Sequence, residues 1–331
     1  MLTAINNPSV NTTKRVEIGE LNGNPGLNRC VGGTSVGSIS AVDKKTGRKF
    51  YLDDPDDLQP GDKVVFLLSL HGGGSVGAWQ RAYFPAFQYK EKYRLVIATP
   101  SAATKAPVRH WAGAADDAHL RNIVDYVFDR YGKDSIASFW IIGHSQGGMT
   151  ANRILGDDYF KDRVDGWLSL SGGRIGPIEL PASFFVAIGG LPPMPAQGGD
   201  TPRPGRASPP DCDISFIFAT GEHEMVALPS TSPWADKYGA GPRVRLADVV
   251  DDEPGQIYDT IREGKSTPAW GLSPRPGTAQ VYLYPKARDG RLIADVVRLD
   301  KGHTEGLEPR ITEELIKMMV AAPGGKARRS S

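Results

Sequence analysis

The sequence predicts an α/β fold in which helices cover both faces of a mostly parallel central sheet. Short apolar runs at residues 64–70, 94–100 and 214–219 are typical of strands that are buried on both faces. Residues 116–131 carry apolar side chains at helical spacing, which predicts an amphipathic helix. Because strands alternate with helices along the chain, the strands should lie parallel with the helices packed on both sides of the sheet.

The remaining elements follow the same alternation. Residues 35–42 and 48–52 alternate between apolar and polar side chains around a turn at residues 43–47, which predicts a β-hairpin. Further apolar runs and helical patterns predict strands at residues 138–143, 164–170, 183–188, 279–284 and 291–299, and helices at residues 146–155, 256–263 and 308–320.

We expect one domain, residues 34–322, with two insertions over the active site. Residues 1–33 are polar and punctuated by Pro, Asn and Gly, so they should form an irregular arm. Residues 189–211 are rich in Pro and Gly. They should form either a loop that extends from the surface or part of a wall over the active site. The second insertion covers residues 225–274. Residues 323–331 should be a disordered basic tail.

The balance of basic and acidic residues limits the kinds of binding partner that we expect. The chain has 331 residues with 39 basic and 38 acidic side chains, so its net charge is +1. This balance gives no reason to expect nucleic acid or an anionic membrane surface as a partner. No run approaches the roughly 18 consecutive apolar residues that a membrane span requires. The oligomeric state is not predicted.

Two observations bear on the compartment. Residues 1–8 have neither the basic nor the apolar region of a signal peptide, so a cytoplasmic protein is the default expectation. A processed secreted or periplasmic form stays open. Cys30 and Cys212, the two cysteines, could form one disulfide or remain free thiols.

Residues 143–147, Gly-His-Ser-Gln-Gly, match the pattern G-x-S-x-G. An apolar run precedes the match and a helix-compatible run follows it, which is the context of a nucleophile elbow. Such a turn holds its serine in a strained conformation that lifts the hydroxyl clear of the sheet. Gly143 and Gly147 would be needed because strand and helix approach too closely for a Cβ atom. We therefore predict that Ser145 is a nucleophile.

A serine hydroxyl needs a positioned base, and a histidine oriented by a carboxylate usually supplies it. In this architecture the chain order is serine, then acid, then histidine. Only His223 and His303 lie well downstream of Ser145. His303 lies between the last predicted strand and the last predicted helix, where the base belongs, so it is the predicted base.

The acid should follow the strand at residues 214–219. Glu224 is the first candidate because it stands three residues after Gly221, and Glu222 is the runner-up. A third alternative stays open, in which both glutamates are solvated loop charges and the acid is Asp251 or Asp252.

Backbone N–H groups should form an oxyanion hole. The amide of Gln146 follows the nucleophile at a helix N-terminus, where the dipole also favours negative charge. A second amide should come from residues 71–74, His-Gly-Gly-Gly, with Gly73 the first candidate and Gly74 the next. His71 itself is expected to orient this loop through hydrogen bonds.

Three tryptophans are candidates for a substrate pocket, namely Trp111, Trp234 and Trp270; the alternative is that they pack in the core. No Cys/His cluster or H-E-x-x-H spacing suggests a metal. No G-x-G-x-x-G follows a strand, so nothing suggests a dinucleotide, and no cofactor is expected.

The motifs together resemble the α/β-hydrolase superfamily and, within it, the polyhydroxybutyrate-depolymerase and feruloyl-esterase-like carboxylesterases. The resemblance rests on Ser69-Leu-His-Gly-Gly73, on Trp111 with Asp117, on Asn122 to Tyr131, on Gly143 to Met149 and on Gly302-His303. It covers roughly residues 63–175 plus short islands near Gly221 and His303.

The resemblance implies the α/β-hydrolase fold and hydrolysis of carboxylic esters by a Ser–His–acid triad without a cofactor. Two departures concern the site. Members of the family often have Asp as the acid, where this chain offers Glu224 or Glu222. The aromatic and proline pattern that follows their histidine is replaced here by Thr304-Glu-Gly-Leu307.

Three hypotheses follow for the function. The first is a serine carboxylesterase that acts on a small-molecule or oligomeric ester. The second is an acyltransferase or peptidase that uses the same triad. The third is a non-catalytic binding protein on a hydrolase scaffold, against which the intact serine, histidine and glycine loop argue.

Overall fold

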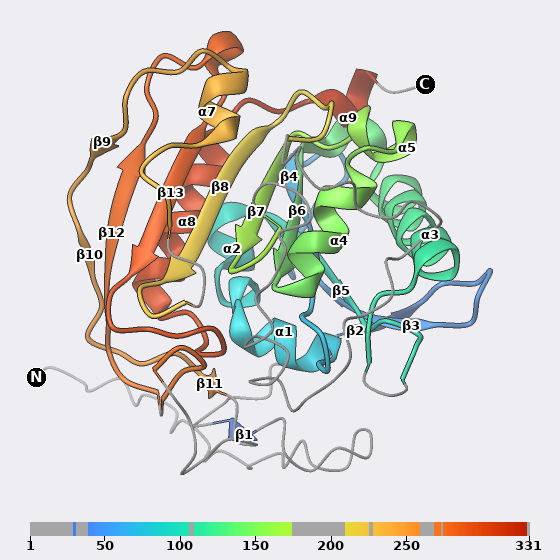
Figure 1. Cartoon of the computed structure of the whole chain (residues 1–331). Helices are drawn as coiled ribbons and strands as arrows, with labels where there is room; N and C mark the ends of the chain where they lie inside the picture. Colours follow the sequence, from blue (N-terminus) through green and yellow to red (C-terminus); the bar gives the residue numbers. More distant parts are fainter. Residues whose placement is uncertain are drawn as a thin grey trace, which may run out of the picture.

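A computed structural model describes residues 29–30, 39–105, 109–173, 209–224, 228–258, 268–272 and 274–329. Its centre is a large twisted sheet with helices on both faces (Figure 1). The strands follow the order β10-β12-β13-β8-β7-β6-β4-β5-β3-β2, and β9 pairs with β12 as well. The predicted fold class, a mostly parallel sheet between helices, is confirmed.

Six neighbouring strands in the middle of this sheet run parallel. Buried apolar residues dominate them, which is the pattern that burial on both faces requires. They are β4 (Val64–Leu70), β5 (Leu95–Pro100), β6 (Ile136–His144), β7 (Gly166–Leu170), β8 (Ser215–Gly221) and β13 (Ile293–Arg298).

Antiparallel strands flank this parallel block. On one side, the predicted hairpin is present as β2 (Ile39–Val42) and β3 (Lys49–Asp53), and β3 pairs with β5. On the other side, β12 (Thr278–Leu283) pairs with β13 and is itself flanked by β9 (Val244–Arg245) and β10 (Val249–Val250). A separate two-stranded sheet joins β1 (Arg29–Cys30) to β11 (Ile257–Tyr258).

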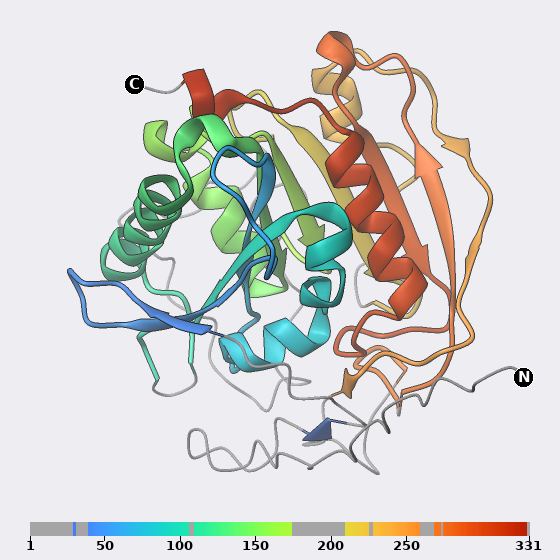
Figure 2. The same cartoon turned by 180° about the vertical axis from the view of Figure 1, so that it is seen from behind.

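The alternation of side chains along β4 divides the core into two halves. Phe66 and Leu68 point to one face, and Val65 and Leu67 point to the other. The first half packs against α3 (Gly113–Tyr131), α4 (Gln146–Ile154), α5 (Asp158–Lys161), α7 (Pro233–Lys237) and α9 (Lys326–Arg329). The second half packs against α1 (Gly77–Tyr83) and α8 (Pro309–Ala321), and α8 lies in front of the sheet when the molecule is seen from behind (Figure 2). The short helices are α2 (Lys90–Tyr93), η2 (Ala86–Tyr89), η3 (Lys133–Ser135) and η5 (Arg288–Gly290).

Several predictions fall partly or wholly outside the described residues. These are the arm at residues 1–33, of which only β1 is described, the strand at residues 183–188, and most of the insertion at residues 189–211. The predicted helix at residues 256–263 is wrong at its start, because Ile257 and Tyr258 form β11 and pair with β1. The main-chain pairing of β11 with β1, which is distant in the sequence, outweighs the weak helical spacing of apolar residues there.

The tail at residues 323–329 is ordered, so the prediction of a disordered tail is wrong for these residues. They include α9, whose Ala327 is fully buried. The Lys326 N–H donates to Oδ1 of the buried Asp165 at 2.9 Å, and Oδ2 of that carboxylate accepts from Phe139 N at 3.0 Å. Asp165 therefore ties the end of the chain to the central strand β6, a contact that the basic composition of the tail gives no sign of.

Two further features are the state of the Cys212 thiol and the character of the helices. Cys212 is a buried free thiol whose pKa is raised to about 11 by burial. Among the described residues, none of the helices has both the length and the apolar content that crossing a membrane requires.

The turn of the β2–β3 hairpin is anchored by Asp43, which leads to a stability prediction. Its carboxylate accepts hydrogen bonds from Thr46 Oγ1, from Asn122 Nδ2 at 3.1 Å and from His119 Nδ1 at 2.8 Å. Although burial raises the pKa of Asp43, these hydrogen bonds hold it well below its usual value. Asp43→Ala should lower the free energy of unfolding at pH 7 by about 3 kcal/mol, because the partners lose a charged acceptor.

The measurement is urea denaturation of both proteins at pH 7 and pH 3. The unfolded state binds a proton near pH 4 while folded Asp43 stays ionised, so its contribution declines as the pH falls below about 4. The difference between the two proteins should therefore shrink at pH 3. Asp129→Ala, at an exposed position on α3, is the control and should change stability by less than about 0.5 kcal/mol. Equal effects of the two substitutions would contradict the prediction.

Candidate active site

Ser145 lies on the turn between β6 and α4, at the carboxyl end of the parallel strands. Its backbone has φ 50° and ψ −115°, in the region that L-residues seldom adopt. Its N–H donates to Leu170 O at the end of the neighbouring strand β7, at 2.8 Å. The strained turn that the G-x-S-x-G motif predicts is present, and it is held by the adjacent strand.

The glycines around Ser145 permit a very close approach of main chain to main chain. A Cβ atom on Gly143 would lie under 3.0 Å from Gly147 O, and one on Gly147 would lie under 3.0 Å from Leu70 O. On the other side, a Cβ on Gly172 would strike the backbone of Ser145. The predicted need for glycine at positions 143 and 147 is confirmed, and Gly172 adds a third such position.

His303 lies in the loop between β13 and α8 and is bonded directly to Glu224. Its Nδ1 is 2.9 Å from Oε2 and 3.1 Å from Oε1 of that carboxylate. Both side chains are nearly buried, with exposed fractions of 6% and 9%. A carboxylate can only accept here, so Nδ1 carries a proton, and in the neutral form of the ring Nε2 keeps a lone pair. The pair has the geometry of a base with its orienting acid.

His144 connects this pair to the elbow. Its Nε2–H donates to the carbonyl oxygen of His303 at 2.9 Å, and the two ring centroids lie 4.9 Å apart. The hydroxyl of Tyr83 also reaches that carbonyl, at 3.4 Å, and its ring lies 4.2 Å from that of His144. Because His144 directly precedes Ser145, these contacts bring the loop of His303 to the elbow.

The sequence did not reveal the roles of His144 and Tyr83. His144 occupies the variable position of the G-x-S-x-G motif, and its partner carbonyl lies 159 residues away. A pattern along the chain holds no information about that contact. The one available signal is that residue 144 must lie beside the nucleophile, so any polar side chain there is a candidate for positioning.

The other carboxylates that the sequence offered have different partners. Glu222 Oε2 accepts from Asp300 N at 2.8 Å and so holds the start of the loop that carries His303. Asp251 accepts from the first N–H groups of α8, those of Arg310 at 2.5 Å and Ile311 at 3.3 Å. Asp252 pairs with Arg310 at 2.9 Å. The proposals of Glu222, Asp251 or Asp252 as the partner of the histidine are therefore wrong.

The loop at residues 71–74 faces the start of α4. Gly73 lies against Gln146, since a Cβ on it would be 3.7 Å from Gln146 Oε1. Gln146 is the first residue of α4, so its N–H has no partner within the helix. The Gly74 N–H is directed to Arg109 O at 2.7 Å, so Gly74 is wrong as an oxyanion donor. Gly73 and Gln146 remain the candidates.

His71 orients this loop as predicted. Its ring is fully buried, its Nδ1–H donates to Gly72 O at 2.7 Å, and its Nε2 accepts from Ala102 N at 3.0 Å. These partners assign the neutral ring with the proton on Nδ1. Trp111 Nε1 donates to His71 O at 2.8 Å and supports the loop from behind.

The similarity of this chain to known proteins lies in its fold. No family model and no curated protein matches the chain in sequence. An acetyl xylan esterase from Aspergillus awamori is similar in structure over 85% of this chain and 98% of its own, with a TM-score of 0.50 and 14% identity. Together with the strand order, this likeness decides the architecture. The chain has the α/β-hydrolase fold.

Two other solved structures are similar to parts of this α/β-hydrolase fold. TT1662 from Thermus thermophilus matches over 86% of this chain and 99% of its own, with 14% identity and a TM-score of 0.45. A thermophilic esterase from the Planctomycetes species Thermogutta terrifontis, with butyrate bound, matches over 58% of this chain and 74% of its own. Its identity to this chain is 15% and its TM-score is 0.38.

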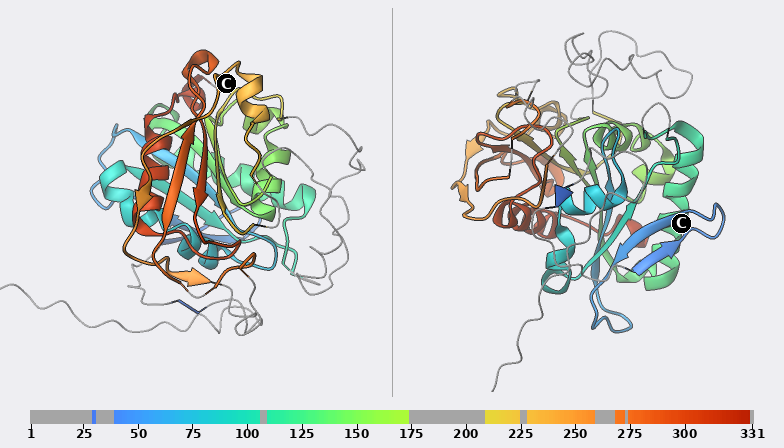
Figure 3. Two further views of the ribbon diagram at one scale, coloured as in Figure 1. Left: turned by 60° about the vertical axis from the view of Figure 1, so that its left-hand side comes forward. Right: turned by 90° about the horizontal axis from the view of Figure 1, so that it is seen from below.

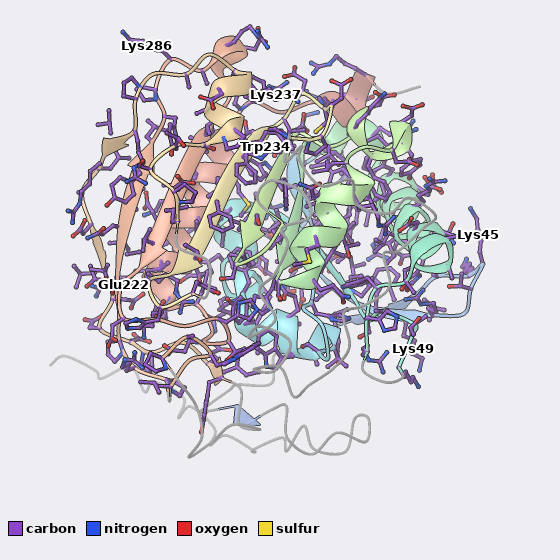
Figure 4. The ribbon with its side chains drawn as sticks, viewed as in Figure 1. Lys45, Lys49, Glu222, Trp234, Lys237 and Lys286 are labelled. Carbon is purple, nitrogen blue, oxygen red and sulfur yellow. The ribbon has the colours of Figure 1, made fainter. Side chains whose placement is uncertain are left out.

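Within the α/β-hydrolase fold, two of the three tryptophans are not at the site. Trp111 is fully buried beneath the loop of His71, so its prediction as a pocket residue is wrong. Trp234 is wrong as well, because it is fully buried and stacks on Phe216 near the start of β8. Figure 4 shows it at the opposite end of β8 from Glu222. Both side chains serve the core, where large aromatic surfaces are most often buried.

Trp270 stays a candidate for the substrate pocket. Its ring meets that of His303 edge to face, with centroids 5.3 Å apart. The main chain around it is bonded to the loop of the base, because His303 N donates to Ala269 O and Thr304 N donates to Trp270 O, both at 2.9 Å. The second predicted insertion therefore reaches the candidate site at residues 269–270. The right-hand view of Figure 3 looks from below toward the end of the sheet to which the arrows of β7 and β8 point in Figure 1.

The electrostatics of the candidate site depend on two buried neutral histidines. Burial lowers the pKa of His71 to about 4. Burial, followed by the neighbouring His303, holds the pKa of His144 well below its usual value. Among the described residues, no group of three or more His, Cys, Asp or Glu side chains could hold a metal.

The buried histidines predict a loss of stability in mild acid. Unfolded His71 binds a proton below pH 6.5, whereas folded His71 resists protonation until about pH 4. Its contribution is complete above pH 6.5 and should decline by about 3 kcal/mol as the pH falls to about 4. Urea denaturation at several pH values between 7 and 4 measures the slope of the free energy of unfolding against pH.

The control for the slope is His223→Gln, a change at a histidine that the structure leaves partly exposed. This variant keeps His71 and His144 and removes only a partly exposed pair with Asp300, so it should change the pH dependence of stability less than His71→Gln does. His71→Gln should show a shallower slope, whatever its stability at pH 7. An unchanged slope in His71→Gln would contradict the assignment of a neutral ring.

Proposed function

We propose that this protein is a serine hydrolase that cleaves carboxylic esters through an acyl-enzyme intermediate. Ser145 is the nucleophile, His303 the general base and Glu224 the acid that orients it. The observation that carries the proposal is the bond from His303 Nδ1 to Glu224, on a loop that His144 joins to the strained elbow. The α/β-hydrolase fold supports it, because this fold places such groups at the carboxyl ends of its strands.

In the first half of the reaction, Ser145 Oγ attacks the ester carbonyl and His303 Nε2 takes the hydroxyl proton. Glu224 stabilises the imidazolium that forms, because its carboxylate already accepts from Nδ1. The tetrahedral intermediate then collapses, the C–O bond to the alcohol breaks, and His303 returns the proton to the leaving alkoxide. The acyl group remains on Ser145.

In the second half, water replaces the alcohol. His303 Nε2 removes a proton from the water as it attacks the acyl-enzyme, and Ser145 leaves with that proton. Both tetrahedral intermediates carry a negative oxygen, which the amides of Gly73 and Gln146 stabilise. Gln146 contributes further as the first residue of α4, since the positive end of the helix dipole favours an anion there.

The proposal of an ester as substrate has a second source of support. The protein from Aspergillus awamori that is similar in fold is an acetyl xylan esterase by its description. The resemblance of the sequence to carboxylesterases also indicates that the bond cleaved is a carboxylic ester. Trp270, edge to face with His303, forms an aromatic wall beside the reacting carbonyl in this proposal.

Covalent labelling tests the nucleophile. The wild-type protein should take one fluorophosphonate group per chain and hydrolyse 4-nitrophenyl acetate, whereas Ser145→Ala should do neither. Loss of the nucleophile typically lowers kcat by about 10⁶-fold. Intact-mass spectrometry and release of 4-nitrophenol are the measurements.

Ser230→Ala, at an exposed serine, is the control and should match the wild type. A label that persists in Ser145→Ala would reject the assignment, and transfer to added amines or alcohols in preference to water would indicate an acyltransferase.

The two glutamates of the β8 loop give a second test. Glu224→Gln should lower kcat by about 10³- to 10⁴-fold, because an amide next to Nδ1 favours the wrong tautomer of His303. Glu222→Gln keeps an oxygen that can accept from Asp300 N, so its kcat should stay within about tenfold of the wild type. Circular dichroism confirms that both variants are folded. A larger loss in Glu222→Gln than in Glu224→Gln would reverse the assignment of the acid.

A further inference from the structure

A second site lies at the opposite end of the sheet from the candidate active site. A cleft of about 810 Å³ opens beside the amino ends of β7, β8 and β13. Figure 4 shows one of its residues, Lys237, next to Trp234 and far from Glu222. We name it the basic cleft after the basic residues that line it, which are Lys161, Arg163, Lys237, Arg288, Arg291, Lys326 and Arg329.

The charge of the basic cleft is unbalanced. Its seven basic residues exceed its four lining aspartates by three charges, and by two once Asp158, which pairs with Lys161 beside the cleft, is counted, in a protein whose total net charge is +1. All four aspartates are exposed to solvent, whereas five of the seven basic residues are partly buried. Water screens the exposed carboxylates more than the partly buried cations, so the interior of the cleft is positive.

Two lysines of the cleft lack a carboxylate partner in the part of the chain that the structure describes. Lys237 Nζ donates to Pro210 O at 2.8 Å and to Cys212 O. Lys326 Nζ donates to Lys161 O at 3.0 Å. Burial holds the pKa of Lys326 below its usual value, and the nearby Arg291 lowers it further. Each ammonium group is fixed by main-chain oxygens that carry no net charge.

Arg291 provides an independent observation. Its side chain is only 9% exposed, and its Nη2 pairs with Asp213 at 2.9 Å. Its Nε is buried and has no hydrogen-bond partner. Burying a cationic donor without a partner is unfavourable, and a nearby anion would offset part of this cost. Because Nε itself has almost no exposed surface, Arg291 would attract an anion in the cleft through its charge and not through a hydrogen bond from Nε.

We propose that the basic cleft binds a small molecule that carries at least two phosphate charges, such as a diphosphate or a phosphate ester. The volume of the cleft lies within the range of small-molecule sites, about 300–1,000 Å³. An excess of two to three positive charges matches a multivalent anion better than a single carboxylate. Arginine and lysine are the side chains that bind phosphate groups most often. This site is separate from ester hydrolysis and does not depend on it.

Calorimetric titration of the full chain with sodium pyrophosphate, at fixed ionic strength, tests the proposal. The variant Arg288→Gln with Arg329→Gln removes two exposed guanidinium groups and should weaken binding by at least tenfold. Lys237→Gln should weaken it similarly. The matched control is Lys45→Gln with Lys49→Gln on the β2–β3 hairpin, two lysines that Figure 4 shows away from the cleft, and it should bind as the wild type does. Circular dichroism confirms that each variant is folded.

The comparison of ligands completes the test. Pyrophosphate or a nucleoside diphosphate should bind, and the tighter of the two identifies whether the organic part is recognised. Sodium acetate at the same ionic strength should produce no measurable heat. The proposal is overturned if neither phosphate compound binds, or if the cleft variants and the hairpin control lose affinity equally. Loss of esterase activity in Ser145→Ala has no bearing on these outcomes, so the two proposals can fail separately.

Discussion

The close packing of main chain around Ser145 is the constraint on which the site depends. The turn from β6 to α4 holds Ser145 at φ 50°, and the hydrogen bond to Leu170 O ties it to the neighbouring strand. Gly143, Gly147 and Gly172 are required because any Cβ there would meet backbone atoms under 3.0 Å away. The strain is sustained by the surrounding parallel strands, which are buried on both faces and cannot move apart.

The loop that carries His303 is held to this turn by two kinds of contact. His144 donates to the carbonyl of His303 from the elbow side. From the side of β13, the buried Arg298 pairs with Glu308 at 3.0 Å and donates to the carbonyls of residues 305 and 306. A fully buried ion pair is costly to break, because removing one partner leaves an uncompensated charge. The loop is thereby fixed while the contact with Glu224 orients the imidazole.

The two ends of the sheet differ in electrostatic character. At the carboxyl ends, buried neutral histidines and backbone amides surround Ser145, which suits a reaction whose charge develops only in the transition state. At the amino ends, Arg291 and the lysines of the basic cleft hold permanent charge. Both regions are formed by segments that follow or precede the same parallel strands, so one sheet positions both.

Sequence by itself determined the parallel strands, the elbow and the identities of Ser145, His303 and Glu224 as candidates. These rest on local patterns, since apolar runs, glycine spacing and chain order are properties of neighbouring residues. Only the tertiary structure showed that Glu224 and not Glu222 contacts His303, that Trp234 lies at the opposite end of β8 from Glu222, and that His144 is bonded to His303. Each of these outcomes depends on side chains far apart in the chain, whose distance is set by the packing of the sheet and which no local pattern encodes.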